Sequence, residues 1–151
     1  MNRSDESFEP PRVYRAMIFD SQDSLPVVGS TAKELGVRIG VDIHVDAGGN
    51  VNLDENGMSV APRWQDLPRY RIPKRLRAVV PGASGSNSVA CFVMGNGAFA
   101  DGIVASGLKL IPDRKPQPIT HGVVAPISAV SLTQYQADLA STRSSWQIDE
   151  T

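Results

Sequence analysis

Three polar side chains stand in short apolar stretches that predict β-strands: Arg15, Ser59 and His121. Ser59 lies between two apolar residues just after an Asn-Gly turn, so a strand there would direct its neighbours to a core and its hydroxyl to the opposite face. Arg15 and His121 have similar settings near the start and the end of the chain. If the three strands meet around a common cleft, these side chains form one shared polar site. If they lie far apart, each is an ordinary polar group.

For Arg15, the spacing of its own strand favours a simpler interpretation. Period-two alternation places Arg15 on one face with Val13, Met17 and Phe19. From this spacing alone we expect an edge-strand arginine, with its apolar stem over the sheet and its charged head in solvent.

A basic segment with interleaved aromatic residues spans 63–77. Such a segment could grip phosphates of a nucleotide or a nucleic acid, with aromatic rings available to stack on bases. The alternative is a solvated loop ordered by prolines, and we expect this for most of the side chains. The basic residues are Arg63, Arg69, Arg71, Lys74, Arg75 and Arg77, the aromatic ones are Trp64 and Tyr70, and Asp66 is the single acid.

His44, Asp42 and Asp46 share the polar face of the clearest alternating stretch, in which the apolar residues of 37–45 alternate with polar ones that end at Asp46. A metal cluster is conceivable there, but a strand face that carries His and Asp is usually just the solvated face of the strand, so we expect no metal site.

Cys91, the only cysteine, lies in an apolar run and is expected to be a buried small hydrophobe. This usage suits a reducing cytoplasm.

The length of 151 residues fits one domain, which we place at 12–151 after a flexible leader at 1–11. The net charge of −1 gives no global attraction to nucleic acid or to an anionic membrane. The start of the chain is polar and acidic, and no apolar run is long enough to span a bilayer, so neither Sec export nor membrane insertion is predicted.

Many Gly and Pro residues and few aromatic ones favour short strands joined by turns. A capping box at Thr31 predicts one helical turn, and a second capping box, Ser131 with Gln134, predicts a C-terminal helix to about Arg143. The stretch 99–110 is ambiguous. Strands are predicted at 13–19, 37–45, 58–60, 89–94 and 119–125.

The order of these motifs resembles a small toxin family with an ADP-ribosyltransferase-like fold, found among type VI secretion effectors and related bacterial polymorphic toxins. The resemblance spans about Val13 to Trp146. It rests on the Tyr-Arg-Ala start at Tyr14, the Gly-x-Ser-Val strand at Gly57, the His-x-x-x-x-Pro segment at His121, and the end helix that contains Tyr135.

The resemblance implies an α+β fold, with two small, mostly antiparallel sheets around a cleft, few short helices and a C-terminal helix. It implies that the cleft holds NAD as a substrate, with Tyr14, Arg15, Met58 and Ser59 as binding residues and Arg15, Ser59 and His121 as catalytic ones. Arg15 would contact a phosphate or ribose, Ser59 would fix the nicotinamide ribose, and His121 would orient the substrate or transfer a proton.

The implied function is an antibacterial toxin that transfers ADP-ribose from NAD or hydrolyses NAD. It would act in the cytoplasm of the producing or recipient cell, where a cognate immunity protein (an antitoxin) neutralises it. Two departures from the family pattern bear on catalysis: Met58 replaces a second hydroxyl, and no glutamate lies in the late strands to stabilise an oxocarbenium-like state. Ala125 stands where a carboxylate residue would be expected. Glu55 could replace the missing glutamate only if its turn folds over the cleft.

Two other functions therefore stay open. One is a non-enzymatic module that contacts nucleic acid or protein through segment 63–77, with salt-sensitive affinity. The other is a catalytically inactive member of the toxin fold that is kept for protein binding.

Overall fold

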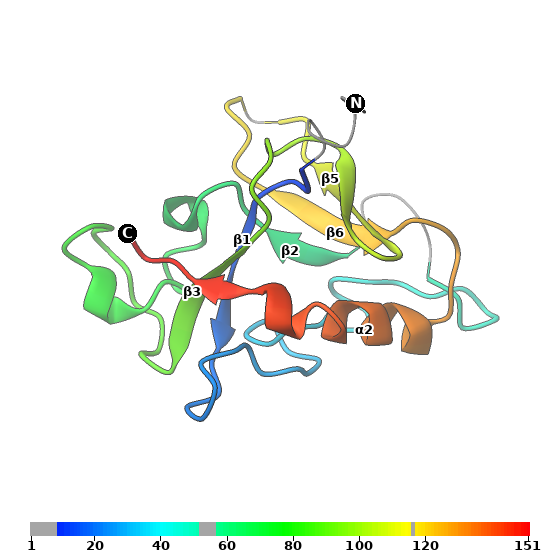
Figure 1. The fold of residues 1–151 in the computed structure, drawn as a ribbon, viewed down its shortest axis with the longest axis horizontal. Helices are drawn as coiled ribbons and strands as arrows, with labels where there is room; N and C mark the ends of the chain where they lie inside the picture. Colours follow the sequence, from blue (N-terminus) through cyan, green and yellow to red (C-terminus); the bar gives the residue numbers. More distant parts are fainter. Residues whose placement is uncertain (1–8, 52–56, 116) are drawn as a thin grey trace, which may run out of the picture.

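The structure is a computed structural model that describes residues 9–51, 57–115 and 117–151. Over these residues the fold is α+β, with two small antiparallel sheets and a helix near the C-terminus (Figure 1). The predicted fold class is confirmed at this level. The elements are β1 (Val13–Ile18), β2 (Met58–Val60), β3 (Val89–Met94), β4 (Gly102–Ala105), β5 (Leu108–Pro112), β6 (Gly122–Pro126), α2 (Leu132–Ala140), β7 (Gln147–Ile148) and three 3₁₀ turns at Trp64–Asp66, Lys74–Leu76 and Arg143–Ser145.

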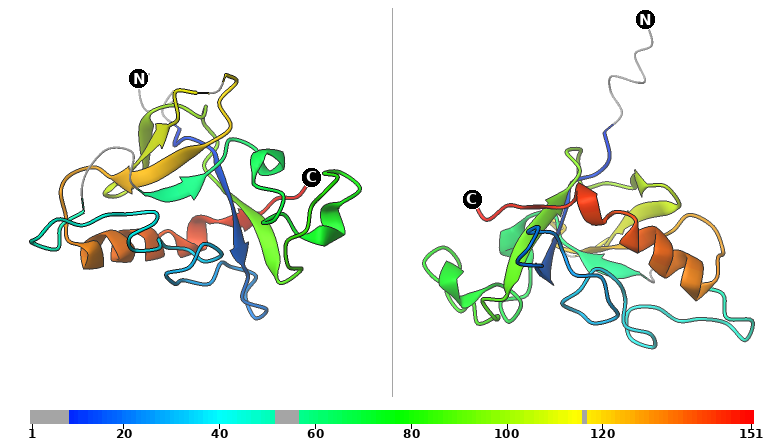
Figure 2. Two further views of the ribbon diagram at one scale, coloured as in Figure 1. Left: turned by 180° about the vertical axis from the view of Figure 1, so that it is seen from behind. Right: turned by 60° about the horizontal axis from the view of Figure 1, so that its bottom comes forward.

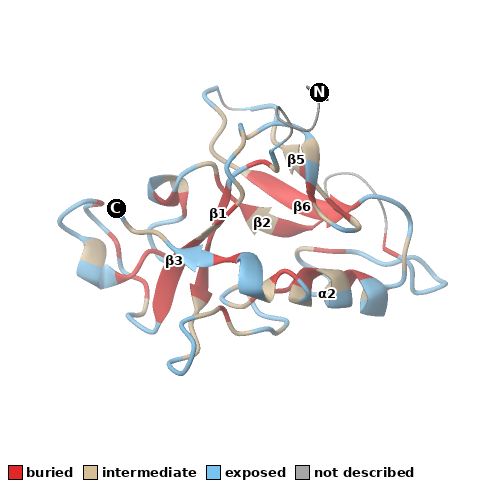
Figure 3. Cartoon of the chain, in the orientation of Figure 1, coloured by how far each residue is buried: buried red, intermediate tan, exposed pale blue. Residues whose placement is uncertain are grey.

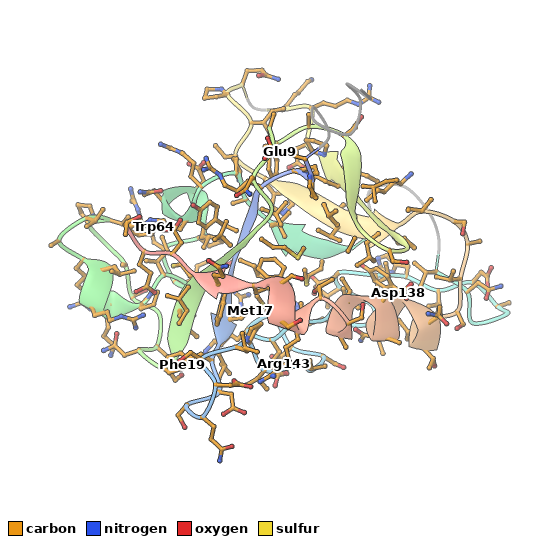
Figure 4. All side chains as sticks on the ribbon, in the orientation of Figure 1. Glu9, Met17, Phe19, Trp64, Asp138 and Arg143 are labelled. Carbon is orange, nitrogen blue, oxygen red and sulfur yellow. The ribbon has the colours of Figure 1, made fainter. Side chains whose placement is uncertain are left out.

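The three-stranded sheet has the order β1-β3-β7, and its strands β1 and β3 are buried on both faces. Alternation along β1 sends Val13 and Met17 into the main core, and sends Tyr14 and Ala16 into a second cluster on the other face. The second cluster includes apolar residues of segment 61–83, among them Trp64, which Figure 4 labels. The indole N–H of Trp64 donates to the Thr151 carbonyl at 3.0 Å. Figure 3 shows β1 and β3 as buried and the connecting segments as largely exposed.

The four-stranded sheet has the order β2-β6-β5-β4, and α2 packs against it (Figures 1 and 2). Ser131 caps α2 by accepting a hydrogen bond from the Gln134 N–H at 3.1 Å, as the capping box predicted. Tyr135 and Leu139, one helical turn apart, enter the main core from this helix. The β4–β5 hairpin begins in the ambiguous stretch 99–110 and extends two residues beyond it.

A short backbone connection links the two sheets. Tyr14 and Ala61 exchange two hydrogen bonds, of 2.8 and 2.9 Å, just beyond the end of β2. This pairing sets β2 beside the start of β1, so Arg15 and Ser59 become neighbours although 44 positions separate them in the chain.

The predicted strand at 37–45 is wrong, because the segment forms turns and isolated bridges. Asp42 accepts hydrogen bonds from both the backbone N–H and the guanidinium of Arg38, and Gly40 has a φ of 82°, so the chain closes into a tight local loop. Ile39 and Val41 are consequently 58% and 62% exposed rather than core residues. The segment near Thr31 is likewise a turn rather than a helix.

Pro10 and Pro11, which the sequence placed in the leader, belong to the folded part. The Pro10 carbonyl accepts from the Gly97 N–H at 2.7 Å, and Pro11 bridges to Gly97. Residues 1–8 of the predicted leader lie outside the described residues. No helix of the described part has the length and apolar character needed to cross a membrane.

Candidate functional site

A cavity of about 330 Å³ opens between β1, β2 and the segment that follows β2, and the three residues singled out from the sequence all line it. Arg15 comes from β1, Ser59 from β2, and His121 from the position just before β6. The other lining residues are Ala16, Ala32, Arg38, Asp42, Val60, Ala61, Asp66, Leu67, Pro68, Tyr70, Arg71 and Thr120.

Arg15 is 5% exposed, so the expected solvated head is wrong. Its guanidinium donates to three backbone carbonyls: that of Ser59 at 2.9 Å, that of Glu34 at 3.0 and 3.2 Å, and that of Gly36 at 3.3 Å. These bonds use four of its five N–H groups, which leaves one for a ligand. Arg15 therefore mainly links β2 to the 34–36 turn, and it lines the cavity with a positive charge.

Burial lowers the pKa of Arg15 to about 10, and the nearby carboxylate of Asp42 opposes this shift. The guanidinium remains charged at neutral pH. Its hydrogen-bond partners are neutral carbonyls, so the charge favours an anion in the cavity.

Ser59 occupies the position that its alternating neighbours predicted. Met58 and Val60 are buried in the main core, while Ser59 is half-buried on the opposite face of β2. The strand is held on one side by β6, where Ser59 pairs with Val123, and its carbonyl is held by Arg15. Its hydroxyl is therefore presented to the cavity from a fixed backbone.

His121 stands at the cavity wall with part of its ring exposed. Its Nδ1 lies 2.8 Å from Oδ2 of Asp113, a residue for which the sequence predicted no role. The backbone N–H of Asp113 donates to the His121 carbonyl at 2.9 Å. Sheet pairing thus brings together a histidine and a carboxylate that lie eight positions apart.

Tyr14 and Met58, which the resemblance added as binding residues, do not line the cavity. The Tyr14 ring lies in the second cluster, and its hydroxyl donates to the Asp149 carboxylate at 2.7 Å. Burial, together with this carboxylate, raises the pKa of Tyr14 to about 12. Met58 lies in the main core. Each is adjacent in sequence to a cavity residue, but its own side chain packs into a buried cluster.

Tyr135 has a structural position that the sequence did not reveal. Its hydroxyl accepts the Met58 N–H at 3.0 Å and donates to the Val124 carbonyl, so it joins the start of β2 to β6. Burial raises the pKa of Tyr135 far above its ordinary value. Gly57 is required beside it, because a Cβ there would clash with the Val124 carbonyl.

The cavity also contains charged and aromatic residues that sequence analysis found only in part. The Arg71 guanidinium carbon lies 5.0 Å from the centre of the Tyr70 ring, and both residues come from the basic segment 63–77. Arg38 pairs with Asp42 at 3.0 Å, and this pair carried no sequence signal because both residues fell on the polar face of a predicted strand.

Three of the six basic residues in segment 63–77 make contacts that stabilise the fold. Arg63 pairs with Asp66 at 3.0 Å, and Arg77 donates to the Ala83 carbonyl at 2.9 Å. Arg75 pairs with Glu150 at 2.7 Å and also donates to backbone carbonyls. A continuous nucleic-acid surface formed by all six cations is therefore not favoured.

No group of three His, Cys, Asp or Glu side chains is arranged to hold a metal ion within residues 9–51, 57–115 and 117–151. Asp42 is engaged by Arg38, and His44 is exposed.

Cys91 is buried as predicted, and burial raises the pKa of its thiol to about 12. Ala125 is buried in β6, and Glu55 lies outside the described residues.

Comparison of the chain with protein-family models, with curated proteins and with solved structures found no significant match.

Proposed function

We propose that this protein is an antibacterial toxin of the ADP-ribosyltransferase-like class that binds NAD in the cavity. It transfers ADP-ribose from NAD to an acceptor or hydrolyses NAD to ADP-ribose and nicotinamide. The observation that carries the proposal is the convergence of Arg15, Ser59 and His121, three residues from separate strands, on one cavity. Convergence of polar groups from distant parts of the chain supports a binding site over three unrelated positions.

The charge of the cavity wall suits a phosphate-containing ligand. Three arginines, Arg15, Arg38 and Arg71, line it against two aspartates, and both aspartates pair with arginines. Arg71 is the cation best placed for a phosphate, because its neighbour is an aromatic ring rather than a carboxylate. Arg38 is the exposed member of the Arg38–Asp42 pair, so its guanidinium can turn toward a ligand phosphate, whose charge would replace that of Asp42.

The size of the cavity limits how much of NAD it encloses. Its volume is near the lower end of the range of about 300–1,000 Å³ typical of ligand pockets. It fits one half of a dinucleotide, and we place the nicotinamide ribose and its phosphate inside. The Ser59 hydroxyl would bond the ribose, and Tyr70, exposed at the rim, offers a ring on which the remaining base can stack.

Cleavage of the nicotinamide glycosidic bond develops positive charge on the ribose, which a carboxylate stabilises. Asp42 and Asp66 are the carboxylates that line the described cavity. Asp42 is the better candidate because its side chain is 8% exposed and its partner Arg38 is 41% exposed, so movement of Arg38 onto a ligand phosphate would release it. Under this proposal Asp42 replaces the late-strand glutamate that the chain lacks.

The proposed site of action is the bacterial cytoplasm of the producing or recipient cell, and the proposed partner is a cognate immunity protein that neutralises the toxin there. The resemblance of the Tyr14, Gly57 and His121 motifs to type VI effectors supports both statements. Co-expression with the immunity protein should restore the growth of cells that produce the toxin.

Matched variants test the site in growth assays. Ser59→Ala and His121→Ala should each relieve growth inhibition after induced expression, whereas Ser128→Ala and His44→Ala should not. Ser128 and His44 are exposed and lie outside the cavity. Full toxicity of both cavity variants at equal protein levels would refute the site.

A chemical assay tests the reaction. Purified protein incubated with NAD should release nicotinamide, measured by chromatography, and the Ser59→Ala protein should release it more slowly. ADP-ribose in solution would indicate hydrolysis, and labelled macromolecules would indicate transfer. An intact NAD pool after incubation with protein that inhibits growth would refute an NAD-consuming function and favour the binding-module alternative.

A further inference from the structure

The pairing of β5 with β6 places Asp113 directly opposite His121. The two strands are antiparallel, and their last paired positions are Pro112 and Gly122. Asp113 and His121 are the next residues outward, and a backbone hydrogen bond of 2.9 Å continues the ladder between them. Residues directly opposite each other in an antiparallel pair have neighbouring side chains, so the sheet itself brings the carboxylate to the imidazole.

The contact between the side chains defines which imidazole nitrogen carries the proton. Asp113 Oδ2 lies 2.8 Å from His121 Nδ1. An ionised carboxylate only accepts hydrogen bonds, so Nδ1 must be the donor. In the neutral ring the proton is then on Nδ1, and Nε2 has a free lone pair.

We propose that Asp113 is a positioning residue that holds His121 in the Nδ1–H tautomer, so that Nε2 accepts a proton in the cavity. His121 lines the cavity, whereas Asp113 does not. The carboxylate therefore reaches the ring from outside the ligand space and fixes its orientation. This arrangement gives His121 the role of general base, which the sequence left open between orientation and proton transfer.

The chemical step rests on the proposed function. In hydrolysis, a water oxygen forms a bond to C1′ of the nicotinamide ribose while the C1′–N bond breaks and its electron pair leaves on the nicotinamide nitrogen. One water proton passes to Nε2 of His121, which becomes an imidazolium still bonded to Asp113 through Nδ1–H. The products are nicotinamide and ADP-ribose, and the imidazolium later releases the proton to solvent. In transfer, a nucleophilic group of the acceptor takes the place of water.

The tautomer can be measured directly because the chain has only two histidines. In a His44→Gln background, His121 is the single histidine, and its two ring nitrogens are assigned from long-range ¹H–¹⁵N correlation spectra at pH 8. The Nδ1–H tautomer should dominate, and Asp113→Ala should abolish that preference while the amide spectrum stays dispersed. A dominant Nε2–H tautomer in the protein that retains Asp113 would overturn the proposal, whether or not the variant folds.

Kinetics of nicotinamide release supply the second readout. Asp113→Ala should lower kcat on the order of tenfold with KM nearly unchanged. In a His121→Ala protein the same change should not lower kcat further, because both substitutions remove the same proton-accepting imidazole function. Asp101→Ala removes an exposed aspartate outside the cavity and should have no effect. Equal losses from Asp113→Ala in both backgrounds would overturn the proposal. If the protein consumes no NAD, the proposed function fails, and the tautomer measurement still decides the role of Asp113.

Discussion

Replacement of each tyrosine by phenylalanine tests how the hydroxyl groups hold the fold, and the structure predicts a clear order. The chain has three tyrosines, Tyr14, Tyr70 and Tyr135. Each change removes one oxygen atom and leaves the ring in place. The three hydroxyls differ in burial and in the number of partners, so the free energies of unfolding should differ accordingly.

Tyr135→Phe should be the most destabilising of the three. Its hydroxyl is fully buried and satisfies both the Met58 N–H and the Val124 carbonyl, which become unpaired in the variant. An unpaired buried backbone group costs about 1–3 kcal/mol, so two of them give a loss of about 2–6 kcal/mol. For a domain of this size such a loss lowers Tm by roughly 4–24 °C.

Tyr14→Phe removes one partly buried hydrogen bond to the Asp149 carboxylate, and the Asp149 oxygen can turn to water. We expect a loss of about 1–1.5 kcal/mol. Tyr70 is 64% exposed, and Tyr70→Phe should change stability by less than about 0.5 kcal/mol.

Urea denaturation followed by tryptophan fluorescence measures the three losses, with the slope of the transition checked for constancy. The reasoning would be refuted if Tyr135→Phe were as stable as Tyr70→Phe. A loss at Tyr14 larger than that at Tyr135 would equally contradict the proposed link between β2 and β6.

Three further predictions concern single groups. The Cys91 thiol should react with a thiol reagent at neutral pH only as fast as the protein unfolds, because it is buried and has a pKa near 12; rapid labelling of the native state would contradict this. The folded pKa of Tyr14 is about 12, against about 10 when unfolded, so its contribution to stability is complete below pH 10 and is lost as pH rises through 12. Alkaline denaturation should therefore be less steep over this range in Tyr14→Phe, and an identical profile would refute the assignment. Arg71→Ala should weaken ADP-ribose binding about tenfold in calorimetry and reduce its salt dependence, whereas Arg69→Ala, outside the cavity, should not; equal effects would favour a diffuse basic surface.

Most of the regular structure follows from local pattern. The apolar alternation of β1, the continuous apolar run of β3 and the capping box of α2 each predicted the element that forms. These patterns predict structure well because the side chains that they place in the core belong to residues that also favour the local strand or helix backbone. The strand predicted at 37–45 failed because the Arg38–Asp42 pair and Gly40 close a loop that alternation cannot reveal.

The site was predicted in part for similar reasons. Ser59 was correctly turned away from the core because its two neighbours are strongly apolar. Tyr14 and Met58, which the resemblance added as binding residues, pack into the second cluster and the main core. Strand alternation alone does not separate them from the cavity, because Ala16 and Val60, on the same strand faces, line it.

Other features of the site depend on tertiary contacts. The burial of Arg15 results from the approach of β2 and the 34–36 turn, whose carbonyls replace solvent around the guanidinium. Asp113 meets His121 through the register of two strands, one of which lay in an ambiguous stretch of sequence. The carbonyls that bind Arg15 and the carboxylate that binds His121 could not be identified without the order of the strands in the sheets.

The most direct test of the central claim is a titration of ¹⁵N-labelled protein with NAD, followed through the backbone amide signals. We predict saturable shifts centred on Ser59, Tyr70, Arg71 and His121, which line the cavity from three parts of the chain. The signals of β4 and β7, which lie at the far edges of the two sheets and do not line the cavity, should change little. An unchanged spectrum at millimolar NAD, or shifts confined to residues outside the cavity, would contradict the assignment of this cavity as the NAD site.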